Sequence, residues 1–408
     1  MRTDVSRRLR SSDRGAILIH VAVGLLVLLG FSAFAVDMGV MWVSRNQAQN
    51  AADAAALAAA TSLAFDNATQ GQAQQSAIAV GAQNAIWGKA ATIKPADITF
   101  PTCPPGAPGP PDMCVKVNVY RNSGANALPT FFGRLIGVRS QGVQATATAQ
   151  VLITNRSDCV KPWAVPDKWI ENSDSTGKAD GPWSTSSSFD LFYGSGKNKG
   201  TPLPNPDVYI PPFNPDGSAN ANTTGFKIDG TPNDRGLVLT LKPGHPADAI
   251  APGWFLPVDL PRPSGPTTGG DVYRENIDGC NGMIIKPGDT LVNEPGDMIG
   301  PTAQGVNDLI NEDPNAYWDP VSMQVKDSAY GAGGSPRLVA LPVFNTYVYA
   351  MGQQSGRLDI QLSNVLGFFI QGMQGNNVVG VLTHKPVLSG TVNNNEDASF
   401  LRTVILVR

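Results

Sequence analysis

The four cysteines are the residues of this sequence best suited to a covalent role, and an even, small number fits two disulfides in an oxidising compartment. The chain contains Cys103, Cys114, Cys159 and Cys280. No Cys-x-x-Cys pair is present, which argues against a zinc ribbon or a thioredoxin-type site. Three pairings are possible. The first two cysteines bracket a stiff loop, PPGAPGPPDM, so we predict the bridges Cys103–Cys114 and Cys159–Cys280. Four buried free thiols are the alternative.

The other residues that could do chemistry give weaker signals. The three histidines are His20, His245 and His384, and no serine lies in the Gly-x-Ser-x-Gly elbow that a hydrolase triad uses. Residues 214–222 alternate oxygen-bearing side chains as calcium loops do, but they lack the central glycine and distal glutamate of an EF-hand. Solvated turn residues explain that pattern better. We therefore predict no catalytic residue, no metal site and no cofactor.

Charge and composition exclude further classes of function. The 408 residues carry a formal net charge of -3, and 15% of them are charged. No basic field is available to bind nucleic acid, and no acidic tail suggests a charged partner. The 43 glycines and 33 prolines concentrate after residue 100, which predicts many turns and few long helices there.

One apolar segment, from Ala16 to Val36, reads AILIHVAVGLLVLLGFSAFAV. Roughly 20 apolar helical residues span the hydrocarbon core of a bilayer, so the segment predicts a transmembrane helix; a buried helix of a soluble protein is the alternative. His20, inside the span, is either a functional ionisable group or a neutral residue at a packing face.

Arginines set the expected orientation of this span. Five of them precede it, at positions 2, 7, 8, 10 and 14, so the positive-inside rule places residues 1–15 in the cytoplasm and the remaining chain outside. A cleavable signal ending near residues 32–35 is the competing interpretation. The length of the apolar stretch, and the helix that comes directly after it, favour a retained anchor.

The helix is expected to continue beyond the membrane to Phe65. No proline interrupts residues 37–64, and the stretch AADAAALAAA is built from the best helix former. Rows of alanine at four-residue spacing, with glycines in the span, let helices approach closely. The packing candidates are Gly24, Gly30, Ala52 and Ala56. The alanine rows either contact other subunits or are covered by a sheet of the same chain.

The rest of the chain predicts a small α+β unit followed by a loop-rich β domain. A second helix is expected over 72–89, strands over 115–120 and 143–153, and a short helix over 128–136. Residues 154–330 are rich in turn-forming residues with short apolar runs, and residues 393–395 suggest a turn. Strands are expected at RLVALPVFNTYVYAM, RLDIQLS, VLGFFIQGM, VVGVLTH and FLRTVILVR. The predicted divisions are 1–15 (tail), 16–36 (span), 37–153 (stalk helix and α+β unit) and 154–408 (β domain).

Several strings resemble the TadE/TadG-like family of Flp (tight-adherence) pilus-assembly proteins. They are the start Asp13-Arg14-Gly15-Ala16, the Val36-Asp37-Met38-Gly39 end of the apolar span, Arg45, and the block from Gln49 to Ala60. The segments Phe131-Phe132-Gly133-Arg134-Leu135 and Thr146-Ala147-Thr148-Ala149 are similar to segments that family members carry after this block. The resemblance covers roughly residues 13–153. A cut after Gly15 would put His20 where prepilins carry glutamate, so pilin-like processing is not predicted.

The resemblance implies a non-enzymatic envelope protein, a component or accessory of Tad-type pilus assembly in the bacterial cytoplasmic membrane. Its expected partners are the membrane and other pilus-assembly or envelope proteins, contacted through the N-terminal helix. An extracytoplasmic binding or adhesion module that shares only the anchor architecture is the second hypothesis, and an enzyme is the third.

Overall fold

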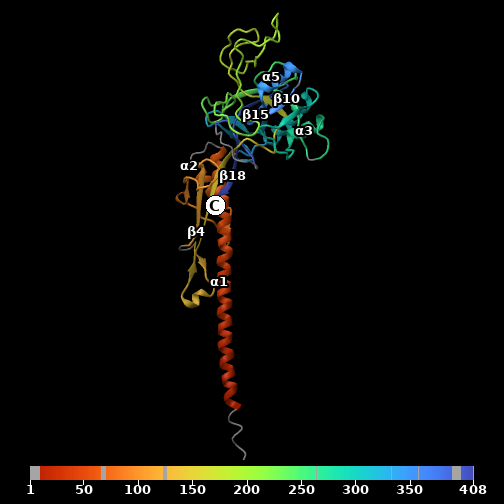
Figure 1. Ribbon diagram of the computed structural model, residues 1–408. Coiled ribbons are helices and arrows are strands. Elements are labelled where there is room, and N and C mark those ends of the chain that lie inside the picture. The colour runs from red at the N-terminus through yellow and green to blue at the C-terminus, as the bar shows by residue number, and fades with distance from the viewer. Residues whose placement is uncertain are drawn as a thin grey trace, which may run out of the picture.

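A single long helix organises the molecule. The computed structural model describes residues 10–65, 70–122, 126–262, 264–331, 333–356, 358–387 and 397–407. Helix α1 (Arg10–Phe65) has 56 residues and is therefore about 84 Å long at 1.5 Å per residue. Figure 1 shows it as a stalk with a sheet packed along its middle and a second domain beyond its C-terminal end. The predicted continuous helix is confirmed.

The surroundings of α1 change sharply along its length. Its apolar side chains from Ile17 to Val36 are largely exposed, with Leu18 at 72% and Phe31 at 71%. From Val40 onward one face is buried, and Ala48 has no exposed surface. Large apolar side chains that no part of the protein covers are typical of a lipid-facing helix. The helix thus has an uncovered apolar half and a half packed on protein.

The packed half of α1 lies on a small five-stranded sheet with the strand order β17-β18-β7-β4-β3. Strand β7 pairs antiparallel with both β4 and β18, and helix α2 (Gln70–Ala82) packs on α1. The 3₁₀ turn η1 (Pro95–Asp97) precedes the edge strand. The strands are β3 (Ile98–Thr99), β4 (Cys114–Arg121), β7 (Val143–Thr154), β17 (Lys385–Pro386) and β18 (Leu401–Val407).

In the core of the small unit formed by α1, α2 and the five-stranded sheet, alanines of α1 pack against alanines of β7. Ala52 and Ala56 are completely buried, in one cluster with Ala145, Ala147 and Ala149 of β7. Alternate residues of a strand share a face, so β7 presents a row of small side chains on which the helix can lie closely. The helix is therefore covered by a sheet of its own chain. The interpretation of Ala52 and Ala56 as contacts to other subunits is corrected, because their side chains are inaccessible.

Of two expected helices, the one over 72–89 is shorter than predicted and the one over 128–136 is absent. Helix α2 ends at Ala82, and residues 85–90 form a hairpin of β1 (Ala85–Ile86) and β2 (Lys89–Ala90). Trp87 and Gly88 take positive φ values of 47° and 72° at its turn, a geometry suited to tight hairpins but not to a helix. Instead of a helix over 128–136, β5 (Leu128–Pro129) pairs with β6 (Ser140–Gln141), and η3 (Gly133–Ile136) is one 3₁₀ turn.

The second domain is built on a closed six-stranded barrel. The order β10-β8-β14-β15-β16-β9 closes through a parallel β9–β10 pairing, and β11 (Thr290–Asn293) bridges β10 and β15. One buried cluster takes residues from all six strands, and β8, β9, β14 and β15 contribute alternate positions, which identifies it as the barrel interior. The barrel strands are β8 (Trp163–Pro166), β9 (Val238–Pro243), β10 (Trp254–Asp259), β14 (Leu338–Phe344), β15 (Ile360–Gln374) and β16 (Asn377–Leu382). The α+β fold class is confirmed.

Helices and one hairpin surround the barrel. Helices α3 (Gly270–Asp278) and α4 (Ile299–Glu312) contribute to the interior cluster, and β12 (Tyr317–Asp319) pairs with β13 (Gln324–Lys326). The predicted strand RLVALPVFNTYVYAM is wrong in its second half. The Asn345 side chain accepts a hydrogen bond from the Val348 N–H and starts α5 (Thr346–Ser355). RLDIQLS and VLGFFIQGM form one strand, β15.

The chain enters and leaves the barrel through neighbouring strands of the small unit. It departs from the end of β7 and returns through β17 and β18, where Leu401 pairs with Thr154. The predicted division at residue 154 is therefore corrected at the C-terminal end, because β18 completes the first sheet. The expected turn at residues 393–395 lies outside the described residues.

The packing of α1 on its sheet generates a stability prediction. Ala56→Leu adds bulk at a fully buried alanine contact, so it should lower the free energy of unfolding by about 1–3 kcal/mol, as overpacking generally does. Asn50→Leu, at an exposed position of the same helix, is the control and should have little effect. Denaturation of the detergent-solubilised chain, followed by tryptophan fluorescence, measures both. Equal stability of the two variants would contradict close packing here.

Candidate functional site

The carboxylate of Asp37 ties α1 to a loop of the small unit. Its Oδ1 accepts a hydrogen bond from the Phe131 N–H at 2.7 Å, and its Oδ2 accepts from the Phe132 and Gly133 N–H groups at 3.1 and 2.7 Å. Gln141 donates from Nε2 to the Asp37 carbonyl at 3.2 Å. Successive backbone N–H groups that converge in this way make a nest for an anion. One helical carboxylate therefore fixes the whole turn.

These hydrogen bonds keep Asp37 ionised. The N–H of Phe131 makes the largest contribution, and with those of Gly133 and Phe132 it outweighs desolvation and lowers the pKa of Asp37 below its ordinary value. Hydrogen bonds to the charged form of a carboxyl have this effect. The group lies immediately after the apolar segment of α1, and its charge marks the end of that segment.

The loop held by Asp37 is closed by internal hydrogen bonds and exposes three apolar side chains. We call residues 130–139 the collar loop. Thr130 donates from Oγ1 to the Val138 carbonyl at 2.5 Å, and the Val138 N–H bonds to the Gly133 carbonyl at 2.9 Å. Gly137 ends the 3₁₀ turn at a φ of 88°, which glycine adopts without strain. Phe131, Phe132 and Val138 remain 55%, 41% and 47% exposed.

A second junction joins the other end of α1 to the barrel. Arg402 on β18 donates from one nitrogen to the Ala64 carbonyl, in the last turn of α1, at 2.9 Å. Another of its nitrogens lies 2.7 Å from Oδ2 of Asp229, which His384 Nε2 also contacts at 3.0 Å. Burial, followed by the charge of Arg402, lowers the pKa of His384 to about 3. At neutral pH the junction is thus an Arg402–Asp229 ion pair beside a neutral imidazole.

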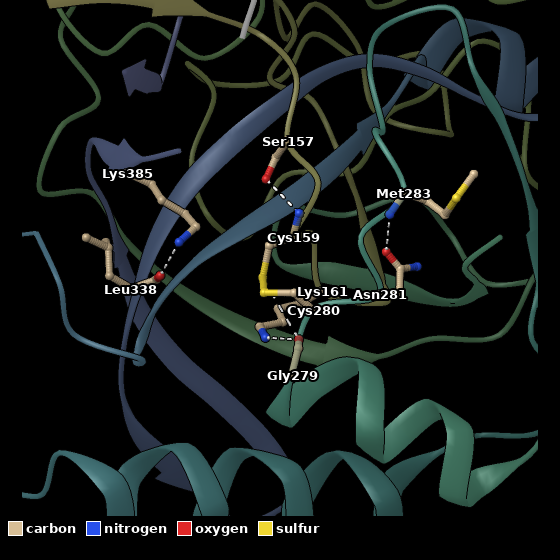
Figure 2. The surroundings of a disulfide bond; sticks show 9 residues. All are labelled: Ser157, Cys159, Lys161, Gly279, Cys280, Asn281, Met283, Leu338 and Lys385. Carbon is tan, nitrogen blue, oxygen red and sulfur yellow. Dashed lines mark hydrogen bonds between the residues drawn. A yellow bond between two sulfur atoms is a disulfide. The ribbon is translucent and has the colours of Figure 1, made fainter. Parts of the chain in front are cut away.

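Both predicted disulfide pairings are present in the structure. The Cys103–Cys114 bridge, with a Cα–Cα distance of 5.3 Å, closes the proline-rich loop beside β4. The Cys159–Cys280 bridge spans 121 residues and ties the start of the barrel domain to the end of α3. Figure 2 shows that Lys161 lies beside this bridge and donates from Nζ to the Gly279 carbonyl, at 2.9 Å. Burial, together with the nearby charge of Lys385, lowers the pKa of Lys161 to about 7.

The barrel domain also carries an open cleft of about 930 Å³, lined in part by Asp190, Tyr193, His245 and Gln353. The His245 N–H donates to Asp248 Oδ2 at 2.7 Å, so His245 lies in the predicted turn. Burial raises the pKa of Asp190 to about 6. The cleft is open to solvent and is lined by both polar and apolar side chains. In the described parts of the chain, no three His, Cys, Asp or Glu side chains are grouped to hold a metal ion.

The remaining predicted residues lie in three separate places. Gly24 and Gly30 are in the uncovered half of α1, where an added Cβ would meet nothing within 4 Å, and His20 is exposed on the same half. Ala52 and Ala56 are buried in the small unit. Residues 214–222 form a turn in which Ser218 bonds to Asp216 Oδ1, in line with the solvated-turn interpretation.

The two junctions are not evident from the sequence. Asp37 and Phe131-Phe132-Gly133 each belong to a family-like string, but nothing in their spacing shows that they meet. The pairing joins a helix to a loop 94–96 positions later. Asp229 lies 155 and 173 positions from its partners His384 and Arg402, and no motif marks these residues.

Comparison with known proteins supports the N-terminal resemblance. Residues 15–62 match the model of a family described as putative Flp pilus-assembly TadE/G-like. The match covers most of α1 and includes Asp37 and the alanine rows. No curated protein and no solved structure matches the chain. The family match is therefore confined to α1, and the barrel domain is characterised by its own structure.

The Asp37 nest generates a prediction about the collar loop. Asp37→Asn removes the charged acceptor of three N–H groups, so amide hydrogen exchange at residues 131–133 should become several-fold faster. Asp53→Asn is the matched control, since Asp53 lies on the same helix and accepts from Gln49 within that helix. Unchanged exchange in Asp37→Asn would contradict the role of the nest.

The lowered pKa of Asp37 determines how protection of the collar loop from amide hydrogen exchange depends on pH. A carboxyl whose pKa is lowered in the folded state stabilises that state above its unfolded pKa and loses this effect as the pH falls through the folded pKa. Protection of residues 131–133 should therefore persist as the pH is lowered to 3.8, the ordinary value, and disappear only below it. The Asp37→Asn variant should not show this transition.

Proposed function

We propose that the chain is a single-pass, non-enzymatic component or accessory of a Tad-type pilus-assembly system. In this proposal α1 anchors the protein in the bacterial cytoplasmic membrane and presents the barrel domain on the outer side. The observation that carries the proposal is the change along α1. Its family-matched sequence is uncovered and apolar up to Val36 and is packed on its own sheet from Val40 onward.

Charge and redox chemistry support the orientation. Arginines precede the span, which favours a cytoplasmic N-terminus. Both disulfides lie on the other side of the span, and disulfides persist in the periplasm and outside the cell but rarely in the cytosol. The N-terminal apolar helix and the disulfides together suggest a membrane-anchored envelope protein.

The uncovered half of α1 is the surface we assign to other membrane subunits. Gly24 and Gly30 both lie on it, with open space where a Cβ would be. Six residues place them about 120° apart around the helix, so each allows close approach on its own side. Helix association in lipid depends on close packing and not on the removal of apolar groups from water, so glycines favour contact. Ala52 and Ala56 play no part in this contact, because the protein's own sheet covers them.

A second candidate function is an extracytoplasmic binding or adhesion module. The observation that favours it is the cleft beside α5, which is large enough for a small ligand. The two functions differ in where partner contacts fall. A pilus-assembly role requires contacts through α1, whereas a binding module requires only the barrel domain.

Topology is the first testable consequence. A single new thiol at Ala221→Cys, an exposed position in the barrel domain, should react with a membrane-impermeant maleimide on spheroplasts. A thiol at Ser6→Cys, in the N-terminal tail, should react only after lysis. The reverse pattern would contradict the orientation, and release of a shortened soluble chain would show that the anchor is cleaved.

Contact with other membrane subunits is the second testable consequence. Gly24→Leu and Gly30→Leu together should abolish the cross-links that the full chain forms with other subunits in native membranes, and should reduce surface pili in a strain that depends on the variant. Val21→Leu with Val27→Leu is the control, since these positions already carry large side chains. Unchanged cross-links and pili in the glycine variant would remove the support for assembly through this surface.

A further inference from the structure

The collar loop lies at the level where α1 leaves the membrane. The apolar segment of residues 16–36 is about 31 Å long as a helix, which matches the hydrocarbon thickness of roughly 30 Å. Asp37 is the next residue. Because its carboxylate lies within 3.1 Å of the N–H groups of Phe131, Phe132 and Gly133, the loop is fixed at the boundary between hydrocarbon and headgroups. The gold chain around residue 130 in Figure 1 accordingly extends further toward the N-terminal end of α1 than the rest of the sheet.

The composition of the collar loop fits that environment. Phe131, Phe132 and Val138 are exposed apolar side chains, and Arg134 and Arg139 beside them are exposed as well. Phenylalanine side chains of interfacial segments bury at the boundary of headgroups and acyl chains, and arginine is attracted to anionic headgroups. Trp42, which is 71% exposed, lies on α1 about 7.5 Å beyond Asp37 and adds a further aromatic group near the same level.

We propose that the collar loop is a second membrane contact, which places Phe131, Phe132 and Val138 in the interfacial region of the outer leaflet and Arg134 and Arg139 among its anionic headgroups. The loop and α1 then hold the small unit on the bilayer at two points, and Asp37 links the two points. One point alone would leave the helix free to tilt and rotate. The proposal rests on the proposed function, in which α1 anchors the chain in the membrane.

Fluorescence in lipid tests the contact directly. The full chain is reconstituted into nanodiscs that contain one copy each, and an environment-sensitive NBD label is placed at Val138→Cys. Reference labels are placed at Leu25→Cys in the span and at Lys116→Cys, which is exposed on β4. Brominated phospholipids should quench most of the fluorescence at positions 25 and 138 and should leave position 116 unchanged.

The possible outcomes distinguish failure of the collar-loop contact from failure of the membrane anchor. Quenching at position 25 without quenching at 138 would overturn the collar-loop contact and leave the anchor standing. If position 138 were unquenched in single-copy nanodiscs but shielded in native membranes, the loop would contact another protein and the lipid proposal would be wrong. Absence of quenching at position 25 would contradict the anchor itself.

Two further arms test the residues that carry the proposal. Asp37→Asn should reduce the quenching at position 138 and leave that at position 25 unchanged, while Asp53→Asn should alter neither. Adding phosphatidylglycerol to phosphatidylcholine nanodiscs should shift the emission at position 138 further to the blue, and Arg134→Gln with Arg139→Gln should remove that increment. Equal emission in both lipids would show that the arginines do not contact headgroups.

Discussion

One helix serves two environments in this protein, and the change between them occurs within about one turn around Asp37. Before that residue, α1 carries large apolar side chains that no described part of the protein covers, as suits a helix in a bilayer. After it, the same helix needs small ones, because a sheet must approach closely enough to cover it. The sequence meets both needs with Leu, Ile, Val and Phe in the first half and rows of alanine in the second. The position of every other element depends on where this change falls.

Polar contacts at the two ends of the packed half hold the remaining parts in place. At the membrane end the Asp37 carboxylate organises the collar loop through backbone N–H groups. At the far end Arg402 joins the last turn of α1 to Asp229 of the barrel domain. The barrel is attached through β7 and β18, which are neighbours in one sheet. Two chain connections and a partly buried ion pair restrict hinge motion, so the barrel should follow the orientation of the helix.

Sequence reasoning is most successful where the signal is local. The continuous helix needs only apolar length, alanine content and the absence of proline, and the strands at 115–120 and 143–153 need only alternation. It fails where tertiary contacts decide. The Asp37 nest uses N–H groups of a segment whose sequence predicts a helix. The hairpin that turns at Trp87 and Gly88 replaces the end of a helix that composition would extend. The barrel closure and the return of β18 depend on pairings between strands distant in sequence, which no local pattern reveals.

The central claim is that α1 continues without a hinge from lipid into the packed unit. Spin labels at Phe31→Cys and Asn50→Cys, both exposed positions on α1, lie on either side of Asp37. Pulsed electron–electron double resonance measures the distance between the two labels on the full chain in nanodiscs. It should give one narrow distribution, centred near the separation of about 28 Å between these positions on a straight helix. A broad distribution, or one centred at a clearly shorter distance, would mean that the helix bends at the membrane surface, and would contradict the claim.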